Sequence, residues 1–511
     1  MANKFYITTP IYYVNDIPHI GHSYTTIAAD ALARFNRRLL GENQVWFLTG
    51  TDEHGQKIQR ASDEAKLTPQ EFVDKVMVKF KELWVKLDIS YNDFIRTTEE
   101  RHIKVVQKAL EILYKSGDIY EDTYEGWYCT PCETFWPETQ LVDHFCPDCH
   151  RPVERISEKN FFLKLGKYQQ DLIKYIEEHK NFIRPDFRRN EVLSFLRLNK
   201  LEDLCISRPK ERLSWGIPLT FSPGHVTYVW FDALINYMSA VGSFDEKNNY
   251  ISKWWDNETE VVHLIGKDIL RHHAVYWPIM LMALQQAGVK GVKLPDTIFA
   301  HGWWLNKDEK MSKSRGNVIS PLFMADKFGV ETYRYFLLRD LPFGLDGNFS
   351  EEAFIKRFNS DLANDLGNLV YRTLTMVEKY FQGVVPEFSS SGERVKEIAA
   401  KLAALPKEVE NSLKAESDFN FVRALENIWE KINLANKYVE ETKPWNLAKE
   451  NKTEELKNFI RLLVEAIRKT GAEIAPFMPR TAGTINEELG SGTIKKGKPL
   501  FPRIEDQKPK K

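Results

Sequence analysis

With 511 residues, of which 43% are hydrophobic and 28% charged, the chain has the composition of a globular protein and is too long for one ordinary core. Its formal net charge of −1 neither favours nor excludes a nucleic-acid partner, because phosphate contacts depend on local Lys and Arg density. Apolar runs such as Trp277 to Leu284 are much shorter than the roughly 18 residues of a membrane-spanning helix, and the N-terminus lacks a signal-peptide core, so we expect a cytoplasmic protein without a membrane partner.

The N-terminal segment predicts a strand, a helix and a second strand. Phe5 to Thr8 is rich in β-forming residues and is closed by Pro10. Apolar residues from Ile27 to Leu39 recur at helical spacing, and Gly41 ends that helix. Val45 to Leu48 reads as a buried strand. Such a βαβ unit implies a parallel sheet, whose ligands bind at the carboxyl ends of the strands.

Candidate ligand-binding residues follow both strands. His19, Gly21 and His22 stand at the start of the helix, where free N–H groups attract phosphate, imidazoles donate further hydrogen bonds and glycine allows close approach. Asp52 and Glu53 follow the second strand and could hold a cationic group or cap the next helix. Taken alone, the histidines fit a surface loop equally well, so neither feature decides the function.

A second βαβ-like half appears much later in the chain. His263 to Ile265 predicts a strand that leads into Gly266-Lys267-Asp268. An apolar helix from about Ile269 to Gln286 and a strand at Thr297 to Phe299 follow. Residues 115–227, between the two halves, differ in character, so we expect an insertion that divides one nucleotide-binding domain.

Four of the five cysteines form two CxxC pairs inside this insertion. Cys129 with Cys132, and Cys146 with Cys149, would place four thiolates on two tight turns, a geometry suited to tetrahedral zinc. Four cysteine ligands leave no open position for water, so we expect one structural zinc ion per chain.

Other interpretations of the cysteines remain open. They could be redox-active or vestigial, whereas a disulfide framework fits poorly without a secretion signal. His144 and His150 flank the second pair, and either could replace a cysteine as ligand. Cys205, between Leu204 and Ile206, reads as a small buried hydrophobic residue.

A polar segment with two lysines follows the second half. Lys310 and Lys313, in the run Lys310 to Asn317, are expected on a loop. Near a triphosphate, the two charges could stabilise a pyrophosphate leaving group. A basic surface turn is the alternative, but a chance match to the five residues from Lys310 to Ser314 is on the order of 10⁻⁴.

From about residue 361 onward the pattern is helical. Leu, Ala, Glu and Lys dominate, which predicts a bundle of about five helices. Trp445 follows Lys443-Pro444 in a connection. It is a candidate for stacking on an unpaired base, with ordinary packing at a helix start as the alternative.

The histidine motif His19 to His22 and the lysine motif Lys310 to Ser314, on a divided nucleotide-binding fold, together resemble the class I aminoacyl-tRNA synthetases. Further segments are similar to the methionine enzymes of that class, and they extend the resemblance over nearly the whole chain: Thr8 to Asn15, Tyr228 to Ala233, Gly266 to Asp268, the cysteine pairs, Gly367 to Arg372 and Lys443 to Trp445.

The resemblance implies an α/β fold with a Rossmann-like parallel sheet split by a zinc-containing insertion and followed by an all-α helical bundle. The implied domains are a catalytic domain at 1–114 and 228–302, a connective insertion with a zinc knuckle at 115–227, a connecting region with the lysine-motif loop at 303–360, and an anticodon-binding domain at 361–511.

The resemblance also implies residue roles. The catalytic residues would be His19, His22, Lys310 and Lys313. ATP would be bound by His19, Gly21, His22, Gly266, Asp268, Trp304, Lys310 and Lys313. Methionine would be bound by Asp52 through its ammonium group and otherwise by Ile11, Tyr13, Trp230, Ala233, Leu234, Tyr237, Ile269, His273 and Trp277. The anticodon would be read by Asn368, Arg372 and Trp445.

The implied reaction joins L-methionine to tRNA(Met), initiator and elongator, through methionyl-adenylate, with ATP accompanied by Mg²⁺. Hydrophobic pockets discriminate one methylene by only about 1–3 kcal/mol, so we expect homocysteine as the difficult competitor and any corrective activity in the same pocket. Some relatives have two pairs of CxxC units, and several have proline in place of Leu234. Many carry a further C-terminal domain, whereas this chain ends soon after Arg503, so we expect a monomer.

Three alternatives remain at this stage. The first is a class I synthetase for cysteine, leucine or isoleucine, against which stand the segment around Trp230 and the missing large editing insertion. The second is a small nucleotidyltransferase, which would not need the helical bundle. The third is a zinc-containing tRNA-binding protein without catalysis, which would not need His19, His22, Lys310 and Lys313.

Overall fold

The computed structural model describes residues 2–15, 17–130, 134–136, 138–147, 149–306, 309–310, 319–388, 392–490 and 492–504. The chain divides into two compact units. Unit 1 consists of Met1–Pro18, Asn36–Val85 and Ile89–His301. Unit 2 consists of His19–Phe35, Lys86–Asp88 and Gly302–Lys511.

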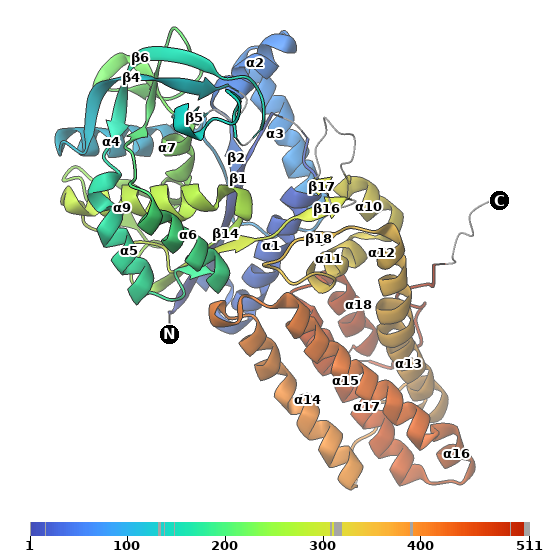
Figure 1. Cartoon of the computed structure of the whole chain (residues 1–511). Coiled ribbons are helices and arrows are strands. Elements are labelled where there is room, and N and C mark those ends of the chain that lie inside the picture. Colours follow the sequence, from blue (N-terminus) through green and yellow to red (C-terminus); the bar gives the residue numbers. More distant parts are fainter. Residues whose placement is uncertain are drawn as a thin grey trace. The chain divides into compact units, whose positions relative to one another are not determined.

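Unit 1 is built on a six-stranded sheet in the order β3-β2-β1-β14-β15-β7. Figure 1 labels its strands β1, β2 and β14. All neighbouring strands are parallel. Along the chain they are β1 (Lys4–Tyr13), β2 (Val45–Asp52), β3 (Asp93–Arg96), β7 (Ile183–Arg184), β14 (Thr259–Gly266) and β15 (Thr297–His301). Since β1 pairs with β14, with Phe5 opposite Glu260, the two halves of the divided domain meet in the middle of the sheet. The predicted parallel α/β sheet is confirmed.

Strand β1 does not end at Pro10, as its sequence suggested. It continues to Tyr13, and its pairing with β2 shifts register between Thr8 and Ile11. Pro10 has no N–H for the ladder, so a local irregularity accommodates it. Such irregularities re-aim side chains, and here the change precedes Ile11 and Tyr13, two candidate methionine-binding residues.

Helices pack around the sheet of unit 1. In α4 (Glu100–Lys115), Val106, Leu110 and Leu113 recur at helical spacing and are buried. α4 contacts α8 (Asn236–Ser239) and α9 (Trp277–Gln286). Two further helices, α2 (Gln56–Glu64) and α3 (Pro69–Lys86), precede the insertion and begin in unit 1.

The helix expected from Ile269 to Gln286 has three parts. Lys267–Ile269 forms a 3-10 turn, His272–Tyr276 a π-helical turn, and α9 begins only at Trp277. Pro278 lies in the first turn of α9. Proline cannot donate to the preceding turn and clashes with its carbonyl, which accounts for the wider turn before it.

The insertion forms its own antiparallel sheet, ordered β5-β4-β6-β8. Its strands are β4 (Ile119–Cys129), β5 (Thr134–Trp136), β6 (Glu154–Leu163) and β8 (Leu204–Cys205). Helices α5 (Gln169–Glu178) and α6 (Asp186–Leu198) follow β6, and between them β7 adds an edge strand to the main sheet. The insertion is therefore tied to the main sheet by a backbone ladder, which the sequence did not indicate. A second small sheet, β10-β11-β9, is formed by β9 (Ser207–Pro209), β10 (Pro218–Leu219) and β11 (Ser222–Thr227).

The last segment of unit 1 returns to the main sheet. It comprises α7 (Val229–Leu234), α8, a hairpin of β12 (Gly242–Phe244) and β13 (Tyr250–Ser252), then β14, α9 and β15. Unit 2 contains most of α1 (Ile20–Leu40). Among the described residues, no helix has the length and apolar character needed to cross a bilayer.

The helices of unit 2 beyond α1 form the predicted bundle and its base. They are α10 (Pro321–Phe328), α11 (Val330–Arg339), α12 (Glu351–Arg357), α13 (Asn368–Phe381), α14 (Glu393–Ser412), α15 (Phe421–Thr442), α16 (Pro444–Lys449), α17 (Thr453–Ile474) and α18 (Pro479–Leu489). A π-helical turn, Phe358–Gly367, joins α12 to α13. A small sheet, β17-β16-β18, consists of β16 (Trp304–Asn306), β17 (Glu309–Lys310) and β18 (Gly347–Asn348).

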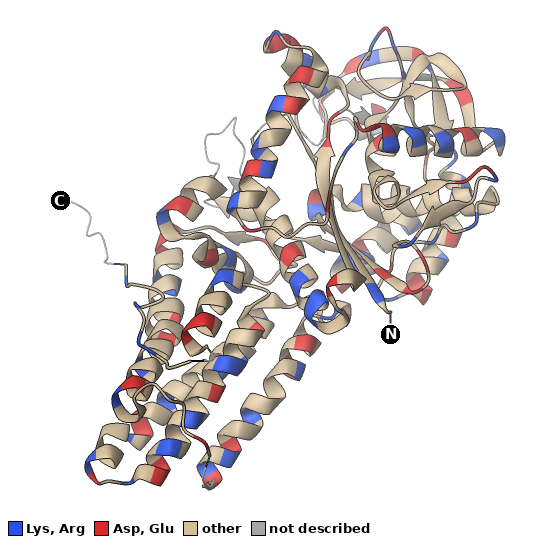
Figure 2. Cartoon of the chain, turned by 180° about the vertical axis from the view of Figure 1, so that it is seen from behind, with Lys and Arg blue, Asp and Glu red and all other residues tan. Residues whose placement is uncertain are grey.

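The bundle is held by apolar helix faces and carries mixed charge outside. α14, α15 and α17 pack against one another, and Phe459, Leu463 and Ile467 of α17 are buried at helical spacing. Figure 2 shows basic and acidic residues interleaved along the bundle helices, as in the pairs of Glu397 with Arg394 and Lys401.

A buried guanidinium ties α1 to the base of the bundle. Arg334 of α11 donates to Asp30 of α1 at 2.6 Å and to the carbonyl of Phe477 at 2.9 Å. Beside it, the hydroxyls of Tyr333 and Ser23 lie 2.7 Å apart. The helix that begins with the histidine motif is thus anchored by a paired, buried charge.

Candidate active site

The two histidines of the N-terminal motif form one compact group at the start of α1. Their rings stack at 3.9 Å with an interplanar angle of 23°. The ring of His19 accepts a hydrogen bond from the N–H of Gly21 (3.1 Å), and the ring of His22 accepts one from the N–H of His19 (3.2 Å). Both side chains are partly exposed. The group therefore offers two imidazoles beside a helix N-terminus, a setting that favours anions.

Gly21 has a role that the sequence did not suggest. A Cβ atom at this position would lie 3.0 Å from Cε1 and 3.2 Å from Nδ1 of His19. The missing side chain therefore leaves room for the His19 ring itself, whatever space it also leaves for a nucleotide.

Three candidate methionine-binding residues lie at the carboxyl ends of β1 and β2. Tyr13 stands opposite Asp52 in the ladder, and Ile11 stands opposite Gly50. Asp52 is only 7% exposed. In open parallel sheets, ligands bind outside the carboxyl ends of the strands, at the point where the strand order reverses. In this sheet the order reverses at β1, so these three residues lie where a ligand is expected.

Asp52 and its neighbour Glu53 have different surroundings. Glu53 is buried and its carboxylate accepts hydrogen bonds from Arg96 (2.7 Å), Thr51 (2.6 Å) and Thr98 (2.6 Å). Glu53 is thus fully engaged by the protein. The next helix, α2, begins after Gly55, which has no side chain to cap it, and the three residues that donate to Glu53 all lie outside that helix.

A second group of candidate methionine-binding residues is joined by hydrogen bonds. Tyr237 Oη lies 2.7 Å from His273 Nε2, and His273 Nδ1 lies 2.9 Å from the carbonyl oxygen of Ile269. A carbonyl can only accept, so Nδ1 carries the proton and Tyr237 donates to Nε2. Burial lowers the pKa of His273 to about 4, although the Ile269 carbonyl opposes it. The imidazole is therefore neutral at pH 7.

His263 contacts two of the proposed pocket rings, those of Tyr237 and Trp277. The sequence placed this residue in a strand and gave it no role in the site. Trp277 donates its indole N–H to His263 Nε2 at 3.3 Å, so Nδ1 donates to the hydroxyl of Thr8 at 2.8 Å. The His263 ring also stacks on Tyr237 at 4.1 Å. Burial holds the pKa of His263 well below its ordinary value. The polar edges of Tyr237, His273 and Trp277 are all directed at protein partners.

The remaining candidates for the methionine pocket lie on or beside α7. Ala233 and Leu234 are buried, and Trp230 is partly exposed. The ring of Trp230 stacks on His272 at 3.5 Å. Burial lowers the pKa of His272 to about 3, so this ring too is neutral and able to pack face to face.

A buried carboxylate on α7 was missed by the sequence analysis. Asp232 lies between two imidazoles, with His54 Nδ1 at 2.7 Å from one oxygen and His102 Nε2 at 2.7 Å from the other. All three side chains are buried. The available signal was an acidic residue inside the apolar run Val229 to Leu234, since a buried charge requires partners.

Arg208 is a second functional candidate that the sequence analysis missed. Its guanidinium is fully buried and lies 4.1 Å from the Tyr228 ring and 5.3 Å from the Tyr128 ring. It lines a cavity of about 10 Å³ together with Gly55, Gln56, Tyr128, Arg212, Leu213, Tyr228 and Val229. The signal was an arginine at the end of the apolar segment around Ile206.

Three of the residues that the resemblance assigns to ATP, namely Gly266, Asp268 and Trp304, are divided between the units. Gly266 ends β14, and a Cβ there would lie 2.5 Å from the carboxylate of Asp268, which is exposed. In unit 2, Trp304 is 4% exposed and packs near Tyr24 and Phe336. A side chain at position 266 would therefore displace the carboxylate of Asp268, whereas Trp304 contributes its ring to the interior of unit 2.

The lysine motif is described only at its first residue. The backbone of Lys310 belongs to β17 and stands opposite Leu305. Lys313 lies outside the described residues, so its position stays a prediction.

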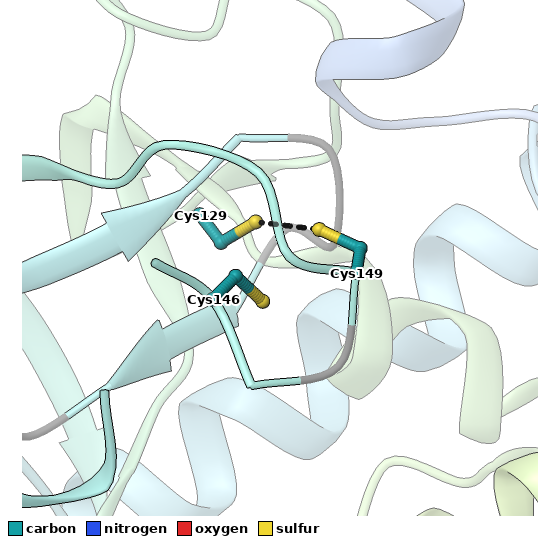
Figure 3. Close-up of side chains that lie close together, drawn as sticks. All are labelled: Cys129, Cys146 and Cys149. Carbon is teal, nitrogen blue, oxygen red and sulfur yellow. Dashed lines mark hydrogen bonds between the residues drawn. The ribbon is translucent and has the colours of Figure 1, made fainter. Parts of the chain in front are cut away.

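The cysteine cluster fits a zinc ion. Donor atoms of Cys129, Cys146 and Cys149 all lie within 4.8 Å of one another (Figure 3). The sulfurs of Cys129 and Cys149 are 3.5 Å apart, too far for a disulfide of about 2.05 Å and close to the roughly 3.8 Å expected between two thiolates on tetrahedral zinc. Cys132 lies outside the described residues. Cys205 is buried away from this group, with Arg208 3.1 Å from its sulfur.

The three residues proposed to read an anticodon belong to the bundle. Asn368 and Arg372 are one turn apart on α13, and Asn368 is exposed. Arg372 forms an ion pair of 2.6 Å with Glu440 near the end of α15. Trp445 follows in α16 and is 41% exposed, which is unusual for so large an apolar ring in a helix start.

Two family models match the chain. One described as tRNA synthetases class I (M) matches residues 5–158 and 151–374. One described as the anticodon binding domain of methionyl tRNA ligase matches residues 385–499.

Known proteins are similar over nearly the whole chain. The methionine–tRNA ligases of Caldanaerobacter subterraneus subsp. tengcongensis and Clostridium tetani are each 50% identical to it, over 99% and 98% of this chain and 80% and 78% of theirs. A solved structure of Mycobacterium tuberculosis methionyl-tRNA synthetase in complex with methionyl-adenylate has a TM-score of 0.89 and 38% identity, covering 98% of this chain and 100% of that one. The apo form of the same enzyme has a TM-score of 0.82 and 35% identity over 99% of both chains.

Proposed function

The chain belongs to the class I tRNA synthetases of the methionyl type, and from that premise we propose how its residues divide the work. Its activity is methionyl-tRNA synthesis, in which ATP activates methionine and the product is transferred to tRNA.

Methionine is bound in unit 1 by two groups of residues. Asp52 holds the ammonium group, and Ile11 and Tyr13 lie beside it at the strand ends. The side chain enters among Trp230, Ala233, Leu234, Tyr237, Ile269, His273 and Trp277. The observation that carries this assignment is the neutral, internally bonded set of Tyr237, His273 and Trp277, because aromatic faces without competing polar atoms suit a polarizable thioether.

Activation needs no nucleophile from the protein. The methionine carboxylate attacks the α-phosphate of ATP, an adenylate forms, and pyrophosphate leaves. Gly266, Asp268 and Trp304 contact the adenosine, with Gly21 beside the phosphates. His19, His22, Lys310 and Lys313 stabilise the charge on the phosphates as the bond breaks. Mg²⁺, when bound with ATP, neutralises part of the same charge.

Transfer follows on the same adenylate. A hydroxyl of the 3′-terminal ribose, the 2′-hydroxyl in this class, attacks the activated carbonyl and AMP leaves. Asn368, Arg372 and Trp445 select initiator and elongator tRNA(Met) by their anticodon, with the exposed Trp445 ring available for base stacking.

Zinc has a structural part only. Cys129, Cys132, Cys146 and Cys149 would hold one ion, and three of these thiols already converge. The ion would crosslink the two loops beyond β4 and before β6 and would supply no chemistry to the reaction. We also propose that the chain acts as a monomer.

Amino-acid-dependent ATP–pyrophosphate exchange across all twenty amino acids tests these roles most directly. We expect exchange with methionine, which requires the adenylate to form without tRNA. Exchange with cysteine, leucine or isoleucine instead would overturn the pocket assignment. Absence of any exchange by the folded protein would remove the catalytic roles of His19, His22, Lys310 and Lys313.

A further inference from the structure

One buried charge in unit 1 has no part in the reaction as described. Asp232 is the only acidic residue of α7, and its carboxylate lies between His54 and His102, each 2.7 Å away. The other nitrogen of His102 lies 2.7 Å from the hydroxyl of Ser239 on α8. This carboxylate therefore links three segments that are far apart in the sequence.

The carboxylate is ionised. Burial raises the pKa of Asp232, but the two imidazoles outweigh this effect and hold that pKa below its ordinary value. Each imidazole therefore donates an N–H to a different oxygen. Charge-assisted bonds of this kind are short and directional, and a buried carboxylate that lost one of them would be left with an unsatisfied oxygen.

The bond to His54 connects the two halves of the proposed methionine site. His54 follows Asp52 by two residues, while Asp232 shares α7 with Trp230 and Ala233. The segment around His54 is also held by Trp215, whose indole N–H donates to the carbonyl of Glu53 at 2.6 Å.

The bond to His102 leads elsewhere. His102 belongs to α4, and its other ring nitrogen contacts the hydroxyl of Ser239 on α8. Its bond therefore connects α7 to α4 and α8, and not to the segment of Asp52. Asp232 thus has two hydrogen bonds of equal length to two different segments. Removing each bond separately shows which of the two segments matters for methionine binding.

We propose that His54 and Asp232 are positioning residues that set the distance between the ammonium-binding carboxylate and the side-chain pocket. The inference rests on the proposed role of Asp52. The two residues do not touch methionine. They fix where its ammonium group lies relative to its thioether. The enzyme therefore selects amino acids by the distance between the ammonium group and the end of the side chain.

The test compares ligands with and without the amino group. The probes are methionine and 4-(methylthio)butanoate, which has the same side chain and carboxylate but cannot use Asp52. The ratio of their dissociation constants gives the contribution of the amino group. Methioninol, which keeps the amino group and lacks the carboxylate, checks that the effect follows the amino group.

The informative variant is His54→Leu and its matched control is His102→Leu. Each removes one donor from Asp232 and leaves the other, so both carry a similar cost in stability. We expect His54→Leu to weaken methionine and methioninol about tenfold, since misplacement of a positioned group by about 1 Å can cost as much as about 100-fold. The binding of 4-(methylthio)butanoate should stay within about twofold. In His102→Leu all three ligands should stay within about twofold of the wild type. His54→Asn, whose amide can donate from the place of Nδ1, should restore most of the loss.

Two results would overturn the inference: an equal loss of 4-(methylthio)butanoate and methionine in His54→Leu, or an equal loss of the amino-group contribution in both leucine variants. Asp52→Asn separates the inference from its premise. If this variant keeps the amino-group contribution, the role of Asp52 is wrong and the inference falls with it. If it loses the contribution while His54→Leu keeps it, only the inference is wrong. Asp232→Asn replaces His54→Leu in the comparison if the latter does not fold.

Discussion

Histidines 263, 272 and 273 in unit 1 are held neutral by burial, which lowers the pKa of each. Neutrality is what lets His273 accept from Tyr237 and His263 accept from Trp277. The same property makes the unit sensitive to acid, because unfolding exposes these rings to water and to protons.

We expect the protein to lose stability as the pH falls from 6.5 towards 4. His273 has a pKa of about 4 when folded and about 6.5 when unfolded, so the unfolded chain binds more protons in this window. The stabilising contribution is complete above pH 6.5, and about 2 kcal/mol of it is lost at pH 5. Denaturant unfolding at pH 7 and pH 5 measures the loss.

The variant His273→Asn should show a smaller difference between the two pH values than the wild type. His179→Asn is the control, since His179 is exposed, and it should leave the difference unchanged. A wild-type protein that is equally stable at both pH values would contradict the buried-histidine account.

At the scale of single residues, the sequence identified those that belong to a short local motif. His19, Gly21 and His22 stand together in the chain and form one group in space. Asp232 is different, because its partners His54 and His102 lie 178 and 130 positions away. No local pattern connects them, and only the folding of unit 1 brings them together.

At the scale of elements, the cysteine loops give a direct test. β4 and β6 pair along their length, and Cys129 is the last residue of β4, whereas Cys146 and Cys149 precede β6. Cys146→Ser should therefore remove zinc from about one ion per chain to none and make the loops near residue 140 sensitive to protease, because a structural site loses its ion when a ligand is lost.

Cys205→Ser is the matched control for that experiment. Cys205 is buried outside the cluster, so this variant should keep its zinc and its resistance to protease. Zinc retained at the wild-type level in Cys146→Ser would remove Cys146 from the ligand set.

Element types were predictable and several element limits were not. The strand at Phe5 and the helix of α1 followed from hydrophobic periodicity. Pro10 was taken as the end of β1, yet the shift in register lets the strand continue to Tyr13. Pro278 caused the opposite error, since the apolar run from Ile269 reads as one helix although the π-helical turn interrupts it. Proline acts through the hydrogen bond it cannot make, and its neighbours decide what replaces that bond.

At the scale of the whole molecule, activation and tRNA selection are assigned to two groups of residues that share no member, which predicts that the two functions can be separated. Trp445→Ala should reduce the kcat/KM for tRNA charging by about 5- to 150-fold, since stacking on a base is worth about 1–3 kcal/mol. ATP–pyrophosphate exchange should be unchanged, because it needs no tRNA.

Phe388→Ala is the control for this prediction. Phe388 is another exposed aromatic residue of unit 2, 46% exposed against 41% for Trp445, and is not among the proposed anticodon residues. Equal losses in the two variants would indicate a general effect of removing surface aromatics, and unchanged charging by Trp445→Ala would exclude its role.

The order of the sheet could be foreseen only in part. Two βαβ-like halves separated by an insertion indicated a divided parallel sheet, and the structure confirms it. The edge strand β7 could not be foreseen, because Ile183–Arg184 is too short to give a periodic signal and becomes a strand only by pairing with β15.

The pairing of β1 with β14 also governs how the protein can be made. Thr8 and its partner His263 are separated by 255 positions, and a ribosome adds roughly 5–20 residues per second. For about 10 to 50 s the growing chain carries β1 with one edge open, an apolar strand that could pair with the wrong neighbour. The sheet can therefore be completed only after β14 has been synthesised. Nascent chains that are halted before residue 259 should bind chaperones more than longer nascent chains do.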